Sequence, residues 1–169
     1  AYEIKECDWS SDVCSSDLPA DVREAARRCV LDWMAVSLAG ADDPLIRILI
    51  DTALEEGGNP RCTLVAQSEH VSPLQAALIN GTTSHALDYD DVNLAMNGHP
   101  TAAVLPAILA LAETRDSSGA EIIAAFLAGY ETAARIGLLV APGHYAQGFH
   151  STCTLGVIGA AAGCARSEE

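Results

Sequence analysis

Residues 101–114, with the sequence TAAVLPAILALAET, decide which fold this chain can adopt. Nearly every position in this stretch is apolar or small, so a helix formed here has no polar face to turn toward water. Such a helix is buried, and other elements have to cover it on all sides. The stretch therefore predicts a central helix inside a multi-helix domain.

The segments before this stretch have the spacing of helices that cover a core. Apolar residues recur every three or four positions from Pro19 to Gly40, and Asp43-Pro44 starts a second helix that ends at Gly57. Ser72-Pro73 is a typical cap and first residue of a third helix. We expect this third helix, or a broken continuation of it, to place His85 and Asp88 one turn apart on one face.

The segments after it follow the same pattern. Ser118 and Glu121 form a capping box for the next helix, residues 137–148 predict a loop, and residues 151–165 predict an Ala/Gly-rich helix. The only strand-like run is residues 61–66, which we expect to be a short edge piece. The whole pattern predicts an all-α, multi-helix domain.

The composition limits the partners and the location. The chain has 169 residues, of which 50% are hydrophobic and 19% are charged, as is typical of one globular domain. A formal net charge of −14 argues against nucleic acid as a partner. No run resembles a signal peptide or a membrane span, so we expect no membrane partner. The six cysteines form no C-x-x-C pair, which argues against a zinc site. Four of them lie in apolar helical contexts, where a free thiol acts as a small hydrophobic side chain, so we expect a reducing, cytoplasmic location.

Both ends of the chain look foreign to the domain. Residues 8–18 (DWSSDVCSSDL) have no hydrophobic period and look like a translated sequencing adapter. Residues 166–169 (RSEE) look like the start of such an adapter as well. We therefore expect a non-native leader at 1–18, a natural domain at 19–165 that is truncated, and a non-native tail at 166–169.

Titratable side chains concentrate just before the central helix. His85, Asp88 and Asp91 precede the sequence Gly98-His99-Pro100, and burying each such group costs several kcal/mol unless it is paired. His99 and a second histidine, His150, both stand just before a predicted helix. Imidazole is the natural proton shuttle near neutral pH, a carboxylate such as Asp88 can fix its tautomer, and exposed helix N–H groups favour an anionic ligand. These residues predict one pocket that His99 and His150 share.

Three other interpretations of the same residues stay open. Asp88, Asp91 and His99 could bind a divalent metal ion, although on a helix Asp90 would point away from Asp88. The histidines could instead cap helices or fill the core. The chain could then be a helical interaction module without chemistry.

Four motifs together resemble the MmgE/PrpD family. They are residues 80–91 (NGTTSHALDYDD), 98–107 (GHPTAAVLPA), 129–131 (GYE) and 148–152 (GFHST). The family includes 2-methylcitrate dehydratase, cis-aconitate decarboxylase and iminodisuccinate epimerase. The resemblance implies the large helical domain of such an enzyme without its α/β lid, a homodimer when complete, and neither metal nor cofactor.

The resemblance also implies roles for individual residues. His99 would be an acid or base, His150 would bind or protonate the substrate, and Asp88 would orient the site. Substrate-binding positions would be His85, Asp91, Thr101 and Ser151.

The expected reaction is dehydration of a small hydroxy-polycarboxylate of the 2-methylcitrate type, with epimerase or decarboxylase activity as the alternatives. In the decarboxylase branch a threonine follows the aspartates, whereas Val92 stands here with one extra residue before His99, which argues against decarboxylation. The family's catalytic lysines come after residue 165, and residues 19–165 contain no lysine, so we expect this chain to be inactive by itself.

Overall fold

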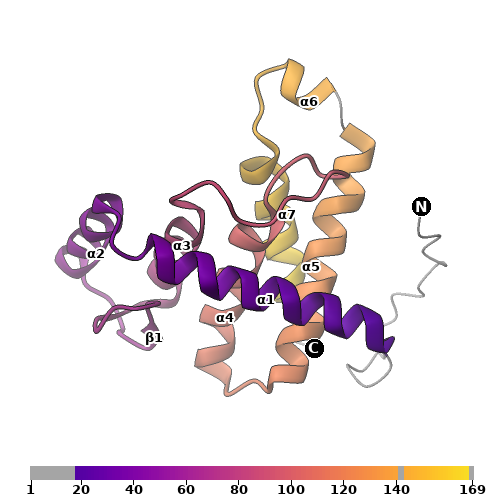
Figure 1. The fold of residues 1–169 in the computed structure, drawn as a ribbon. Coiled ribbons are helices and arrows are strands. Elements are labelled where there is room, and N and C mark those ends of the chain that lie inside the picture. Colours follow the sequence, from indigo (N-terminus) through magenta and orange to yellow (C-terminus); the bar gives the residue numbers. More distant parts are fainter. Residues whose placement is uncertain (1–17, 141–142, 168–169) are drawn as a thin grey trace.

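The structure, a computed structural model, describes residues 18–140 and 143–167, and within them the chain is a helical domain with one small hairpin (Figure 1). The hairpin consists of β1 (Cys62–Thr63) and β2 (His70–Val71), which pair antiparallel. The helices are α1 (Ala20–Gly40), α2 (Pro44–Glu56), α3 (Pro73–His85), α4 (Pro100–Arg115), α5 (Gly119–Val140), α6 (Gly143–Ala146) and α7 (Ser151–Arg166). The prediction of an all-α domain is confirmed.

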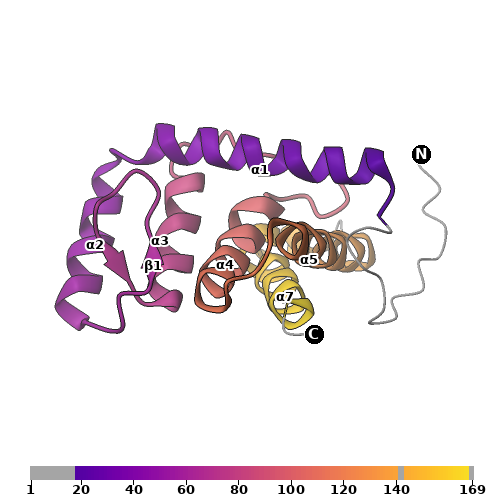
Figure 2. The ribbon, with the colours of Figure 1, turned by 90° about the horizontal axis from the view of Figure 1, so that it is seen from below.

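Helix α4 is the centre of the domain. Figure 2 shows α1 lying along one side of α3, α4 and α5, while α7 packs on the opposite side of α4 and α5. Val104, Leu105 and Ile108 of α4 are each 0% exposed. They share one hydrophobic cluster with Trp33 of α1 and Phe126 of α5. The helix without a polar face is thus covered on several sides, as its sequence predicts.

Glycines bring α5 and α7 into close contact behind the central helix. A Cβ atom added to Gly129 of α5 would lie 2.6 Å from the Gly159 carbonyl oxygen of α7 and 2.7 Å from a methyl group of Val104. A Cβ added to Gly159 would likewise lie 2.7 Å from the Gly129 carbonyl oxygen. Only glycine fits at these two positions, so the two backbones lie against each other.

The third helix is shorter than expected. Helix α3 ends at His85, and Asp88 has the left-handed backbone conformation, with φ of 52°, outside any helix. Aspartate tolerates this conformation better than most residues, and it turns the chain away from the helix axis. The expectation that His85 and Asp88 share a helix face is therefore wrong, and so is the idea that Asp91 follows one helical turn later.

Two further boundaries differ from the expectation. Residues 137–148 are not one loop, because α5 continues to Val140 and α6 follows at Gly143–Ala146. Gly137 does not end the helix; a Cβ there would lie 2.5 Å from Met96 Cα, so the glycine serves close packing. Strand β2 was not predicted from the sequence; in the structure it pairs with β1 so that Val71 lies opposite Cys62.

Helix α5 is, among the described residues, the one helix that is long and apolar enough to cross a membrane by length and composition. In this domain it packs along α7 and α4, and 39% of its most apolar window is buried. Most of the expected leader and tail, residues 1–17 and 168–169, lies outside the described residues.

The contact between α5 and α7 predicts the effect of a single methyl group. Gly129→Ala should destabilise the protein by about 1–3 kcal/mol, because the overpacking outweighs the better helix propensity of alanine. Gly119→Ala is the matched control, since nothing lies within 4 Å of a Cβ at that position. Urea unfolding measures both variants, and equal stability of the two would contradict the close contact.

Candidate active site

The site lies where α3 ends and α4 begins. The loop between them, residues 86–99, folds back on itself through an isolated bridge in which the Asn93 N–H donates to the Gly98 carbonyl oxygen at 2.9 Å. This fold places the end of α3, with His85, beside the start of α4, with His99. His99 stands at the N-cap position of α4, so the expected junction between loop and helix is confirmed.

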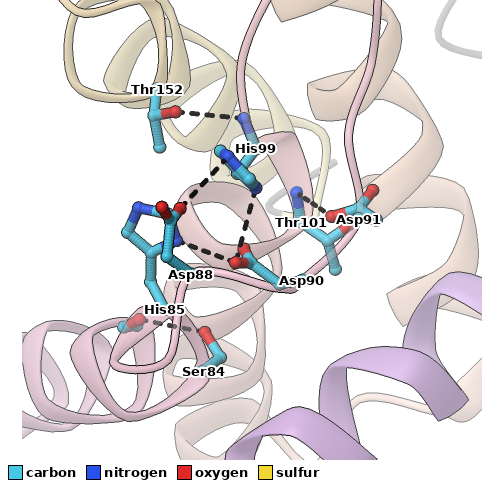
Figure 3. Close-up of polar contacts among 9 residues, drawn as sticks. Ser84, His85, Asp88, Asp90, Asp91, His99, Thr101 and Thr152 are labelled. Carbon is cyan, nitrogen blue, oxygen red and sulfur yellow. Dashed lines mark hydrogen bonds and ion pairs between the residues drawn. The ribbon is translucent and has the colours of Figure 1, made fainter.

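Two histidines and two aspartates meet where the end of α3 faces this loop (Figure 3). His85 Nδ1 lies 2.8 Å from Asp90 Oδ1, and His99 Nδ1 lies 3.4 Å from the same oxygen. On the other edge of its ring, His99 Nε2 lies 3.6 Å from Asp88 Oδ1. The two imidazole rings are 4.7 Å apart between centroids. We call these four residues, His85, Asp88, Asp90 and His99, the His–Asp cluster.

The two carboxylates of the cluster have opposite surroundings. The Asp90 side chain is 2% exposed, whereas that of Asp88 is 79% exposed. The hydrogen bond to Asp90 raises the pKa of His85 above its usual 6.5, and this effect outweighs burial, which lowers it. The negative charges of Asp90 and Asp88 raise the pKa of His85 further. The buried carboxylate of Asp90 is thus paired with the His85 imidazole, whose raised pKa favours the protonated, charged ring.

Asp91 points to the other side of the loop and caps α4. Its Oδ1 accepts from the Thr101 N–H at 3.3 Å, and its Oδ2 accepts from the Thr101 hydroxyl at 2.8 Å. Thr101 is in the first turn of α4, where N–H groups have no partner within the helix. Burial raises the pKa of Asp91, while these two bonds lower it. The structure thus pairs Asp91 and Thr101, two predicted substrate-binding residues, with each other.

A half-buried thiol and a half-buried phenol lie near the same carboxylate. Burial raises the pKa of Cys29 in α1 to about 11 and that of Tyr130 in α5 to about 12, and the charge of Asp91 adds to both shifts. Both side chains therefore stay protonated at neutral pH. This side of the loop is a structural junction of α1, α4 and α5.

His150 stands in front of the neighbouring helix. It is the N-cap residue of α7, it is exposed, and its ring lies 5.5 Å from that of Tyr145. Two residues on, the Thr152 hydroxyl accepts from the His99 N–H at 3.0 Å. A Cβ on Gly98 would lie 2.9 Å from the Thr152 N atom, so the N-termini of α4 and α7 touch.

The structure thus brings the two helix starts together, and Ser151, in the first turn of α7, is 2% exposed beside them. His150 is not among the four residues of the His–Asp cluster. A pocket shared by His99 and His150 stays a prediction.

The His–Asp cluster has the donor types that bind transition metals, and its donor atoms lie within 4.8 Å of one another. Bonds of about 2.0–2.2 Å in tetrahedral geometry would separate two ligand atoms by about 3.4 Å. The His85–Asp90 distance of 2.8 Å is instead that of a hydrogen bond. A metal ion would have to break this bond. Asp91, which the metal interpretation included, faces Thr101.

Asp90 is the residue that sequence reasoning missed. Its neighbours Asp88 and Asp91 were preferred because a helical segment would turn Asp90 away from them. The left-handed turn at Asp88 removes that premise and directs Asp90 inward. Thr152 was missed as well, because its partner His99 is 53 residues away. A backbone turn and a contact between distant segments leave no local signal in the sequence.

Comparison of the sequence with models of known protein families identifies the family of this chain. The family model described as the MmgE/PrpD N-terminal domain matches residues 6–168. The chain belongs to the MmgE/PrpD family.

Curated relatives of this MmgE/PrpD chain agree with that assignment. The chain is 29% identical over 164 residues to a cis-aconitate decarboxylase-like protein of Aspergillus oryzae. This match covers 92% of this chain and 34% of that protein. It is 29% identical to cis-aconitate decarboxylase of Aspergillus terreus over 78% of this chain and 28% of that enzyme. The human cis-aconitate decarboxylase is also 29% identical, over 86% of this chain and 31% of the enzyme. The chain thus spans about a third of the length of these relatives.

The cap on α4 predicts a stability change that is separate from the His–Asp cluster. Asp91→Ala should destabilise the protein by about 1–3 kcal/mol, because it leaves the Thr101 N–H and hydroxyl without their acceptor. Thr101→Val should cost less, since the N–H bond to Asp91 remains. Urea unfolding measures both variants, and a larger loss for Thr101→Val than for Asp91→Ala would contradict the capping role.

The His85–Asp90 pair predicts how stability depends on pH. Because the folded-state pKa of His85 is raised, its stabilising effect is fully present below pH 6.5 and is lost as pH rises through the raised value. The difference in unfolding free energy between the wild type and Asp90→Asn should therefore shrink from about pH 5 to pH 8. Urea unfolding at several pH values measures this difference. With Asp116→Asn, an exposed carboxylate at the end of α4, the difference should stay flat. An equally flat difference for Asp90→Asn would contradict the pair.

Proposed function

We propose that this chain forms the helical part of a lyase that acts on a small polycarboxylate by moving a proton at a carbon next to a carboxylate. The observation that carries the proposal is the position of His99, whose ring lies between a buried carboxylate and an exposed one at the start of α4. Membership of the MmgE/PrpD family, which contains cis-aconitate decarboxylases, supports an enzyme over an interaction module.

His99 has the surroundings of a proton-transfer group. Its side chain is 16% exposed, so most of the ring is fixed by protein while part of it can meet a ligand. The nitrogen that faces the exposed Asp88 is Nε2, and this is the atom we assign to the substrate. An imidazole held in one orientation within hydrogen-bond reach of a substrate carbon acid meets the geometric requirement for general acid–base catalysis.

The adjoining helix starts suit an anionic substrate. The N-termini of α4 and α7 touch through Gly98 and Thr152, and both present the positive ends of their helix dipoles there. The His–Asp cluster itself carries carboxylates, which repel a polycarboxylate. We therefore place the cationic groups that bind such a substrate in the part of the relatives' length that this chain does not span.

Two reactions use the same proton-transfer site. In decarboxylation the bond to the leaving CO₂ breaks and an acid delivers a proton to the resulting carbanion. In dehydration a base removes the proton next to a carboxylate, and the β-hydroxyl takes up a proton from an acid and leaves as water. The named relatives favour decarboxylation of a cis-aconitate-like tricarboxylate. Dehydration of a 2-methylcitrate-like substrate is the second candidate, because Val92 stands where the family resemblance implies a threonine in decarboxylases.

The choice between the two reactions is tested with the complete protein encoded by the gene. Purified enzyme is incubated with cis-aconitate and, separately, with 2-methylcitrate, while CO₂ release and loss of the hydroxyl are measured. Turnover of cis-aconitate with CO₂ release supports decarboxylation, and loss of water from 2-methylcitrate supports dehydration. Failure of both would overturn the proposal. Light scattering on the same sample tests the homodimer, which we propose from the family resemblance.

The proposed role of His99 predicts how much its substitution lowers the turnover. His99→Ala in the complete enzyme should lower kcat by about 10²–10⁴-fold, the usual contribution of a general acid or base. His70→Ala, an exposed histidine in the hairpin, is the matched control and should keep wild-type turnover. Steady-state kinetics of both variants, with circular dichroism to verify folding, decides the point. Full turnover of folded His99→Ala would remove His99 from the mechanism.

A further inference from the structure

We propose that Asp90 is the positioning residue of His99, holding the ring proton on Nδ1 so that Nε2 is the nitrogen that meets the substrate. This inference rests on the proposed role of His99 in proton transfer. It assigns to the buried Asp90 the function that sequence reasoning gave to Asp88.

The two nitrogens of His99 face different environments. Nδ1 lies 3.4 Å from Asp90 Oδ1, a group whose side chain is 2% exposed. Nε2 lies 3.6 Å from Asp88 Oδ1, whose side chain is 79% exposed (Figure 3). Water competes with an exposed carboxylate for its hydrogen bonds and weakens its hold on a partner. The buried carboxylate is therefore the one that can fix the tautomer, and it lies on the Nδ1 side.

Two unpartnered atoms in the cluster support this pairing. Among the described residues, His99 Nδ1 and Asp90 Oδ2 are both buried side-chain atoms without a hydrogen bond. Leaving such atoms unpaired costs about 1–3 kcal/mol each. One is a ring nitrogen that can donate, and the other is a carboxylate oxygen that accepts. Rotation of the carboxylate about its own axis would give His85 one oxygen and His99 the other, which satisfies both.

His85 completes the arrangement from the far side. It bonds to Asp90 at 2.8 Å, and the raised pKa of His85 favours its charged form. A carboxylate that pairs with an imidazolium is an acceptor only. Asp90 can then accept a hydrogen bond from a protonated Nδ1 of His99 but cannot donate one to Nδ1. This favours the tautomer of His99 that carries its proton on Nδ1.

The backbone holds His99 where this contact is made. The His99 N–H donates to the Thr152 hydroxyl, and the next turn of α4 is capped by Asp91 through Thr101. The left-handed turn at Asp88 brings Asp90 back toward the ring. Side-chain rotation is then the only adjustment that the pairing requires.

The direct test is the tautomer of His99 in the free, complete protein. With ¹⁵N-labelled histidine, the two ring nitrogens give separate shifts that identify which one carries the proton, and the spectrum of His99→Gln assigns the signals. We expect the Nδ1–H tautomer in the wild type. Finding Nε2–H there would overturn the proposal, and this measurement needs neither substrate nor a folded Asp90 variant.

Variants of Asp90 test the consequence for turnover. Asp90→Asn, whose amide can donate to Nδ1, should lower kcat by at least about 10²-fold with little change in KM, as a wrong tautomer does in other Asp–His pairs. The His99 signals should move toward Nε2–H in this variant. Asp90→Glu keeps the carboxylate and should retain more turnover than Asp90→Asn. Asp116→Asn, which replaces the exposed C-cap carboxylate at the opposite end of α4 from His99, should behave as the wild type.

The outcomes separate this inference from the proposed function. Wild-type turnover in His99→Ala defeats the proposed function, whatever the tautomer is. If His99→Ala is inactive while Asp90→Asn keeps full turnover and the Nδ1–H tautomer, only the role of Asp90 is overturned. A loss of turnover in Asp90→Asn without a change of tautomer also overturns it, because the effect is then structural.

Discussion

The burial of α4 is the constraint on which the rest of this structure depends. A helix that is apolar on every side gains nothing from water, so its neighbours have to enclose it. Trp33 of α1 and Phe126 of α5 supply the largest covering side chains, and α7 closes the opposite side. The N-terminus of this enclosed helix carries His99. Helices α3 and α7, which both pack on α4, each bring one end to that histidine.

Small residues turn this enclosure into a contact between helix ends. Gly129 and Gly159 allow the backbones of α5 and α7 to touch, and Gly98 allows the start of α4 to meet Thr152. With larger side chains at these positions, α7 would stand further from α4 and the His99 N–H would lose its acceptor. The geometry of the site thus depends on close packing of small residues, at Gly98 beside His99 and at the contact between α5 and α7.

Much of this arrangement could be predicted from local sequence, and the failures share one cause. Helix starts at Asp43, Ser72 and Ser118 are visible because caps act within a few residues. The left-handed turn at Asp88 has no such signature, and a helical face was assumed where a loop exists. The assumption of a helix placed Asp88 near His99, which is correct, but for the wrong reason. It also predicted that Asp90 points away, whereas Asp90 lies at the centre of the His–Asp cluster.

The buried carboxylate of Asp90 explains why the cluster carries two histidines where one would serve for proton transfer. An isolated ionised carboxylate in this position would be costly, and replacing such a group with an apolar residue often stabilises a protein. His85 offsets the charge through its 2.8 Å bond, which leaves Asp90 able to act on His99. The first imidazole thus maintains the carboxylate that orients the second. A purely structural cluster would have no need for an oriented, partly exposed ring at its edge.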